Sequence, residues 1–161
     1  MTTIAVTGHM DLTTASVPLV RTALAQTLAP HAGDLVGISC IAQGADSLFA
    51  EAVLKAGGRL VVVIPSRDYR ERKVRPDHAE TFDRLVTAAD EVVVLPYETA
   101  DRQAYAAANS ELLQRADRLA AVWDGEPASG KGGGTADTVL EAQAAGIPID
   151  RIWPTGTARL R

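Results

Sequence analysis

The chain has 161 residues, the size of one domain, and its 47% hydrophobic residues are sufficient for a substantial core, so we expect a single domain over 1–161. The lone cysteine excludes an internal disulfide, and a formal net charge of -4 argues against nucleic acid as a partner. The sequence enters a strand pattern at once and lacks an apolar run of the roughly 18 residues that cross a membrane, so we expect a cytoplasmic protein without a membrane partner.

Short apolar runs alternate with longer amphipathic segments along the chain. The runs cover 3–7, 35–39, 60–64, 91–95, 119–123 and 148–152, and the helices are expected near 16–30, 44–57, 76–89, 101–116 and 134–146. The third, fourth and fifth runs are continuously apolar, which is typical of parallel strands that are covered on both faces. The pattern predicts an α/β fold, a single Rossmann-like three-layer domain with a predominantly parallel sheet.

The loops that follow the strands are the expected binding elements. Right-handed connections place these loops on one edge of a parallel sheet, and open α/β sheets bind ligands there. After the first run, Gly8 lets the backbone approach a ligand and His9 can contact phosphate or serve as an acid or base, although a single histidine can also be a plain loop residue.

The loop after the second run contains small residues at the start of a helix. Gly44 and Ala45 leave room for a ligand, and Asp46 either accepts hydrogen bonds from a ribose or caps the helix. Farther along, the stretch 67–75 mixes acidic residues with five basic ones and lacks apolar spacing. We expect its basic side chains to be exposed on a mobile loop, with at most one reaching a ligand. These residues are Arg67, Arg70, Arg72, Lys73 and Arg75.

The loop after the fifth run is the richest in glycine. Three consecutive glycines between a strand and a helix are conformationally costly in a plain connector but suit a loop that wraps a phosphate. The candidate ligand-binding residues of this loop are Asp124, Gly125, Lys131, Gly132, Gly133, Gly134 and Thr135.

Part of this loop has the spacing of a P-loop. Gly125 to Lys131 fits G-x-x-x-x-G-K, but Gly132 replaces the Ser or Thr whose hydroxyl holds magnesium. The fourth run, at 91–95, also lacks the terminal aspartate that such a metal needs. We therefore do not expect a P-loop nucleoside triphosphatase. We also expect neither a metal ion nor a cofactor.

Together these motifs resemble the SLOG superfamily, the Rossmann-like group that includes the LOG and DprA-like proteins. The resemblance is carried by 4–9, 41–46, Asn109 before 115–119, 123–125 and 133–135. It implies a pocket built by the first, second and glycine-rich loops. LOG-type phosphoribohydrolases have a Pro-Gly-Gly-x-Gly-Thr-x-x-Glu pattern with a carboxylate near the ribose and an arginine. Here only the glycines and threonine match, Asp137 or Glu141 is the candidate catalytic carboxylate, and an equivalent arginine is not evident.

The leading hypothesis is binding or sensing of a phosphate-bearing nucleotide or nucleotide-derived ligand at the carboxyl edge of the sheet. The alternative is a nucleoside 5'-monophosphate N-glycosidase, in which Asp137 or Glu141 would stabilise positive charge on the ribose. Alanine-rich helical stretches at 105–108 and 142–145 leave open an interaction protein, and we expect a homo-oligomer.

Overall fold

The computed structural model describes residues 1–130 and 134–160 of the chain. The described residues form a six-stranded sheet in the order β4-β3-β2-β1-β5-β6, and each pair of neighbouring strands is parallel. The strands are β1 Thr2–Gly8, β2 Leu35–Ser39, β3 Arg59–Ile64, β4 Glu91–Val94, β5 Arg118–Val122 and β6 Ile149–Ile152. The predicted parallel α/β sheet is confirmed.

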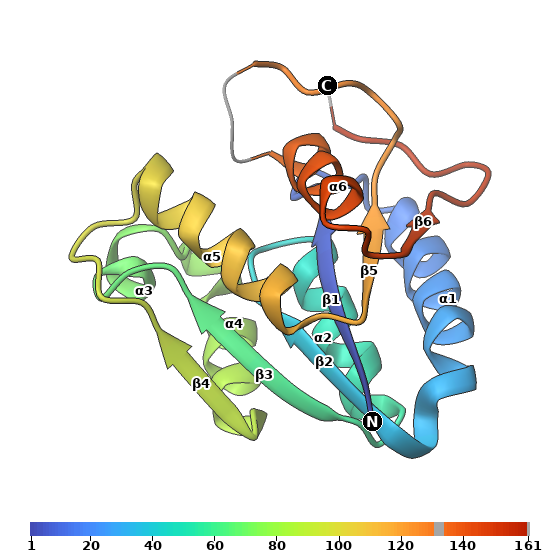
Figure 1. Cartoon of the computed structure of the whole chain (residues 1–161), viewed down its shortest axis with the longest axis horizontal. Helices are drawn as coiled ribbons and strands as arrows, with labels where there is room; N and C mark the ends of the chain where they lie inside the picture. Colours follow the sequence, from blue (N-terminus) through green and yellow to red (C-terminus); the bar gives the residue numbers. More distant parts are fainter. Residues whose placement is uncertain (131–133, 161) are drawn as a thin grey trace.

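Helices cover both faces of this sheet (Figure 1). They are α1 Ser16–Leu28, the 3-10 helix η1 Ala29–Asp34, α2 Ala45–Lys55, α3 Tyr69–Arg72, α4 Pro76–Ala88, α5 Arg102–Arg115 and α6 Thr135–Ala144. Side chains of α1, α2 and α4 pack on one face, and those of α5 and α6 pack on the other. The predicted three-layer arrangement is therefore confirmed. None of the described helices is long and apolar enough to cross a membrane.

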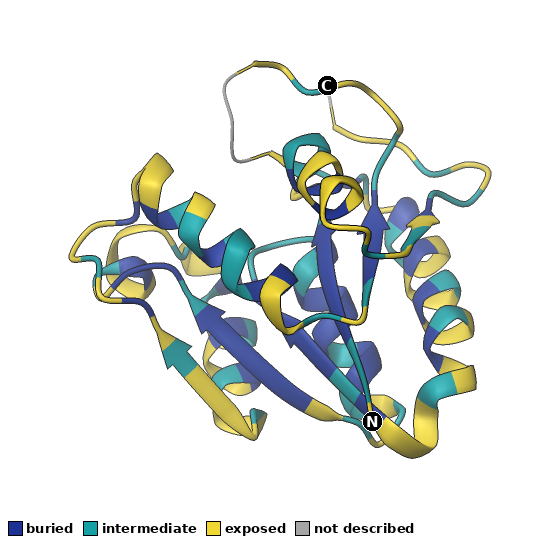
Figure 2. Ribbon diagram, in the orientation of Figure 1, coloured by how far each residue is buried: buried dark blue, intermediate teal, exposed yellow. Residues whose placement is uncertain are grey.

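Alternation along β1 divides its side chains between the two layers of helices. Ile4 and Val6 pack toward α1 and α2, whereas Ala5 packs toward α5 and α6, and all three are buried. The central strands of the sheet are mostly buried (Figure 2). On β2, a Cβ atom at Gly37 would lie 2.3 Å from Cγ2 of Val53. The missing side chain thus lets the C-terminal half of α2 pack close to the sheet.

One strand prediction is wrong. The fourth run was expected to be covered on both faces, but β4 lies at the edge of the sheet and Val92 and Val94 are 40% and 50% exposed. The helix α4 packs Phe82 and Leu85 with Leu60 of β3 instead. Apolar composition predicts a strand here, but it does not reveal that the strand has a neighbour on only one side.

The charged stretch 67–75 is partly helical. It contains α3, whose Tyr69 is buried against α4, so the expectation of a continuous loop is wrong. Its basic side chains are exposed as predicted, at Arg67, Arg70, Arg72, Lys73 and Arg75. The expected mobility of this stretch stays a prediction.

Candidate functional site

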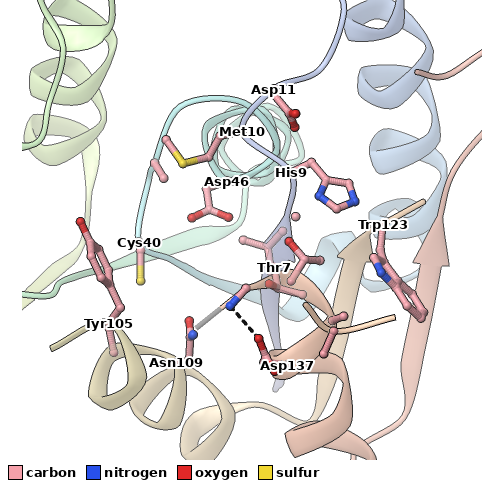
Figure 3. A pocket seen from close by; sticks show the side chains of 18 of the residues that line it. Thr7, His9, Met10, Asp11, Cys40, Asp46, Tyr105, Asn109, Trp123 and Asp137 are labelled. Carbon is pink, nitrogen blue, oxygen red and sulfur yellow. Dashed lines mark hydrogen bonds between the residues drawn. The ribbon is translucent and has the colours of Figure 1, made fainter. Parts of the chain in front are cut away.

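A cavity of about 760 Å³ opens at the carboxyl edge of the sheet. It is bordered by the loops that follow β1, β2 and β5, by α5 and by the start of α6 (Figure 3). The predicted convergence of the three loops at one pocket is confirmed for the described residues. Since these loops are separated by most of the chain, the parallel topology brings them together.

Gly8 lines the cavity and also permits close packing beneath it. A Cβ atom there would lie 2.4 Å from Cβ of Ala45 and 2.9 Å from Cβ of Val122. A side chain would push α2 and β5 away from β1. The glycine is therefore required by the packing of the site, whether or not its backbone contacts a ligand.

His9 joins the first loop to the third. The side chain is 8% exposed, and Nε2 lies 3.2 Å from both the backbone N and Oδ1 of Asp124. Its ring also meets Trp153 edge-on at a centroid distance of 5.7 Å. Burial lowers the pKa of His9, and the nearby Arg159 adds to this effect. The neutral ring accepts the N–H of Asp124 at Nε2, which ties together two walls of the cavity.

Gly44 and Ala45 do not line the cavity, and they dock the second loop on the first. Gly44 has φ +85°, and a Cβ atom there would lie 2.7 Å from the backbone O of His9. The N–H of Ala45 donates to the same oxygen at 3.2 Å. These residues thus position the site.

Asp46 does line the cavity, and its side chain points into it (Figure 3). The residue belongs to the first turn of α2, but the backbone N–H of Ala42, in the preceding loop, donates to its carboxyl group. Burial raises the pKa of Asp46 to about 7, and the hydrogen bond from Ala42 opposes this shift. The carboxyl group is therefore close to half-protonated at neutral pH.

The third loop contributes Asp124, Gly134 and Thr135 to the cavity wall. Gly125 does not line the cavity, and a Cβ atom there would lie 2.9 Å from the guanidinium group of Arg151. The predicted ligand-binding residues Lys131, Gly132 and Gly133 lie outside the described residues.

The two candidate catalytic carboxylates lie in different environments. Asp137 lines the cavity and accepts the N–H of Gly134 at 3.1 Å, which closes the first turn of α6. Glu141 does not line it and instead accepts a hydrogen bond from Ser110 on α5 at 2.9 Å. Of the two, only Asp137 is placed to contact a bound ligand.

Several lining residues were not identified as site residues from the sequence. Asn109 carried part of the family resemblance, and Lys73 is the one residue of the five basic ones that lines the cavity. Arg159 comes from the segment after β6, and it donates to Oδ1 of Asp11 at 2.9 Å and approaches Oδ2 of Asp124 at 3.4 Å. Residues on helices or near the C-terminus do not directly follow an apolar run, so the sequence pattern did not mark them as site residues. Further examples of lining residues not identified from the sequence are Tyr69, Tyr105, Leu112 and Glu126.

Comparisons with known proteins agree with this architecture. No protein-family model and no curated protein matches the chain. DprA from Streptococcus pneumoniae has a similar structure, with 18% identity and a TM-score of 0.71 over 97% of this chain and 52% of that one. DprA from Helicobacter pylori is 19% identical, with a TM-score of 0.67 over 98% and 68% of the two chains. A molybdenum cofactor binding protein from Rippkaea orientalis is 18% identical, with a TM-score of 0.59 over 93% and 75%.

The fold is that of a Rossmann-like α/β domain, and this chain shares it with DprA and with the molybdenum cofactor binding protein. The chain spans about half the length of the S. pneumoniae protein. The H. pylori protein binds single-stranded DNA. The fold therefore occurs in a nucleic-acid-binding protein, and the net charge of -4 alone does not exclude nucleic acid as a partner.

Proposed function

We propose that the protein binds a phosphate-bearing nucleotide or nucleotide-derived small molecule in the cavity at the carboxyl edge of the sheet. The observation that carries this proposal is the convergence of three distant loops on one cavity of about 760 Å³. This volume lies in the usual range of small-molecule sites. The predicted residues that line it are Gly8, His9, Asp46, Asp124, Gly134, Thr135 and Asp137.

The start of α6 is the proposed phosphate position. The first N–H groups of a helix lack partners within the helix and carry partial positive charge, so they favour an anion. Gly134 and Thr135 form this start and line the cavity. Gly134 has φ -86°, which other residues also adopt, so its lack of a side chain matters here for space and not for backbone conformation.

The charge of the wall limits how many phosphates the ligand carries. The described lining residues include the carboxylates of Asp11, Asp124 and Asp137 but few basic groups, and Arg159 is already paired with two of these aspartates. Carboxylates accept hydrogen bonds from ribose hydroxyls but repel additional phosphates. These contacts support a monophosphate over a triphosphate.

Calorimetric titration tests this function with AMP, ADP, ATP and inorganic phosphate as ligands. We expect AMP to bind more tightly than ATP. Gly134→Val should weaken AMP binding at least tenfold, which is more than it lowers stability, because the new side chain would fill ligand space whereas its cost to stability is that of valine at the N-cap of α6. Gly33→Val is the matched control, since nothing lies within 4 Å of a Cβ atom at Gly33 and this residue does not line the cavity.

The same titration separates the other ligands of this fold. A single-stranded oligonucleotide tests the activity of the H. pylori protein, and a molybdenum cofactor preparation tests that of the R. orientalis protein. The proposal would be contradicted if none of the nucleotides binds, or if AMP binds the wild type and Gly134→Val with equal affinity.

The second candidate is the nucleoside 5'-monophosphate N-glycosidase, favoured by the position of Asp137 in the cavity. A carboxylate beside the ribose would stabilise the positive charge that develops as the bond to the base breaks. Incubation with nucleoside monophosphates, followed by chromatography for free base, tests this activity. Asp137→Asn should abolish release and Glu141→Gln should preserve it. Absence of release by the wild type would exclude the enzyme and leave the binding function intact.

A further inference from the structure

The end of the cavity next to β2 has a different chemistry from the end next to α6. We call it the β2 end, and it is lined by Cys40, Asp46, Tyr69 and Tyr105. The rings of Tyr69 and Tyr105 meet edge-on with their centroids 6.4 Å apart, and Tyr69 is 6% exposed. This end thus combines two aromatic rings and a thiol with a single carboxyl group, whereas backbone N–H groups lie at the α6 end.

We propose that the β2 end holds the heteroaromatic ring of the ligand, and that the carboxyl group of Asp46, which points into the cavity, pairs with a ring edge that has an N–H donor beside an acceptor. This inference rests on the proposed function, because the phosphate of the same ligand would lie at the start of α6. It adds the chemical class of the ring and the residue that recognises it.

The surroundings of Asp46 favour the neutral form of its carboxyl group. Among the described residues, no basic side chain contributes to the pKa of Asp46, which burial raises to about 7. Burial disfavours the charged form, so the neutral form of the carboxyl group is well populated near neutral pH although the N–H of Ala42 favours the ionised form. Burial also raises the pKa of Cys40 and of Tyr69, so these neighbours are uncharged at neutral pH.

Other titratable groups border the cavity, but they do not contribute to the pKa shift of the Asp46 carboxyl group. Lys73 follows α3, Tyr105 belongs to α5, and the remaining groups lie in the other loops and at the start of α6. The remaining groups are His9, Asp11, Asp124, Glu126, Asp137 and Arg159.

A neutral carboxyl group presents one O–H donor and one carbonyl acceptor side by side. Adenine presents the complementary pair, an amino group next to a ring nitrogen, and it is flat enough to lie against tyrosine rings. An ionised carboxylate can only accept, so it would leave the ring nitrogen without a donor. Ligand affinity should therefore follow the protonation of Asp46.

Calorimetric titration of three proteins with AMP and with purine riboside 5'-monophosphate, which lacks the amino group, tests the inference. The wild type should bind AMP roughly tenfold more tightly than the analogue near pH 6.5, and Asp46→Ala should bind the two equally. Asp46→Asn should keep the preference, because an amide also has a donor beside an acceptor.

The pH dependence supplies a readout that a purely structural role for Asp46 would not change. Between about pH 6.5 and about pH 8.5 the neutral fraction falls from roughly three quarters to a few per cent, so the AMP affinity of the wild type should fall about tenfold more than that of Asp46→Asn. The comparison cancels the titration of the ligand phosphate and of the other cavity groups. Asp77→Asn, the same change on the exposed first turn of α4, should behave as the wild type.

The outcomes separate this inference from the function on which it rests. If AMP binds but discrimination and pH dependence are the same in the wild type and both Asp46 variants, the ring is not read by Asp46 and only this inference is overturned. If no nucleotide binds to the wild type at either pH, the proposed function and the inference are both overturned. Thermal melting of each variant verifies that it is folded, and Asp46→Asn still decides the pH arm if Asp46→Ala does not fold.

Discussion

Replacement of Asp46 by asparagine should stabilise the protein, and the gain should grow with pH. Burial raises the pKa of Asp46 from 3.8 to about 7. Between these values the unfolded chain releases a proton that the folded protein retains, so the free energy of unfolding falls as pH rises and the loss is complete above about pH 7. A shift of about three units corresponds to at most about 4 kcal/mol. Asparagine has nearly the same shape, stays neutral, and can still accept the N–H of Ala42.

Urea denaturation of the wild type and Asp46→Asn at several pH values measures this effect. From about pH 4.5 to about pH 8, the stability of the variant relative to the wild type should increase by up to about 3 kcal/mol. Asp77→Asn controls for the loss of one carboxyl charge from an exposed position. A gain that does not change with pH, or a variant less stable than the wild type at pH 8, would show that Asp46 is ionised in the folded protein and would refute the reasoning.

Three further substitutions test how the fold supports the site. Gly44→Ala should lower the free energy of unfolding by about 2 kcal/mol or more, because φ is +85° and the new atom would meet backbone, whereas Gly33→Ala should cost little; urea denaturation measures both. Arg159→Met should cost at most about 1 kcal/mol at low salt and less in 1 M salt, since its ion pairs are partly exposed, and a cost that is independent of salt would contradict this. Val62→Thr should destabilise by about 1–3 kcal/mol and Val92→Thr, its register partner on β4, by less than about 0.5 kcal/mol; equal losses would show that β4 is covered.

The strands were predictable because hydrophobic runs are local. The run at 35–39 coincides with β2 Leu35–Ser39, and the other observed strands differ from the predicted runs by about one residue at their ends. The order of strands depends on which runs become neighbours, which the composition of a run does not encode. Val92 and Val94 show the consequence, since an edge strand can be as apolar as a central one.

The glycines show a second limit of sequence analysis. Gly44 and Gly125 follow strands, have positive φ and satisfy the pattern of a ligand-binding loop, but the space beside each is occupied by other parts of the protein. A glycine in such a loop indicates that something approaches the backbone closely. Whether the approaching atom belongs to a ligand, to the His9 backbone or to the Arg151 side chain depends on tertiary packing.

Asp46 combines the predictable and unpredictable parts of the site. Its position follows from the sequence, since it comes just after the loop of a parallel strand and therefore lies at the binding edge. Its protonation does not, because the burial that raises its pKa comes from the packed structure, in which Tyr69 of α3 and Tyr105 of α5 line the same cavity. No sequence motif marks either tyrosine as a site residue, and the sequence pattern around α3 predicts a charged loop. The sequence therefore locates the carboxyl group, and the fold decides whether that group donates or only accepts a hydrogen bond.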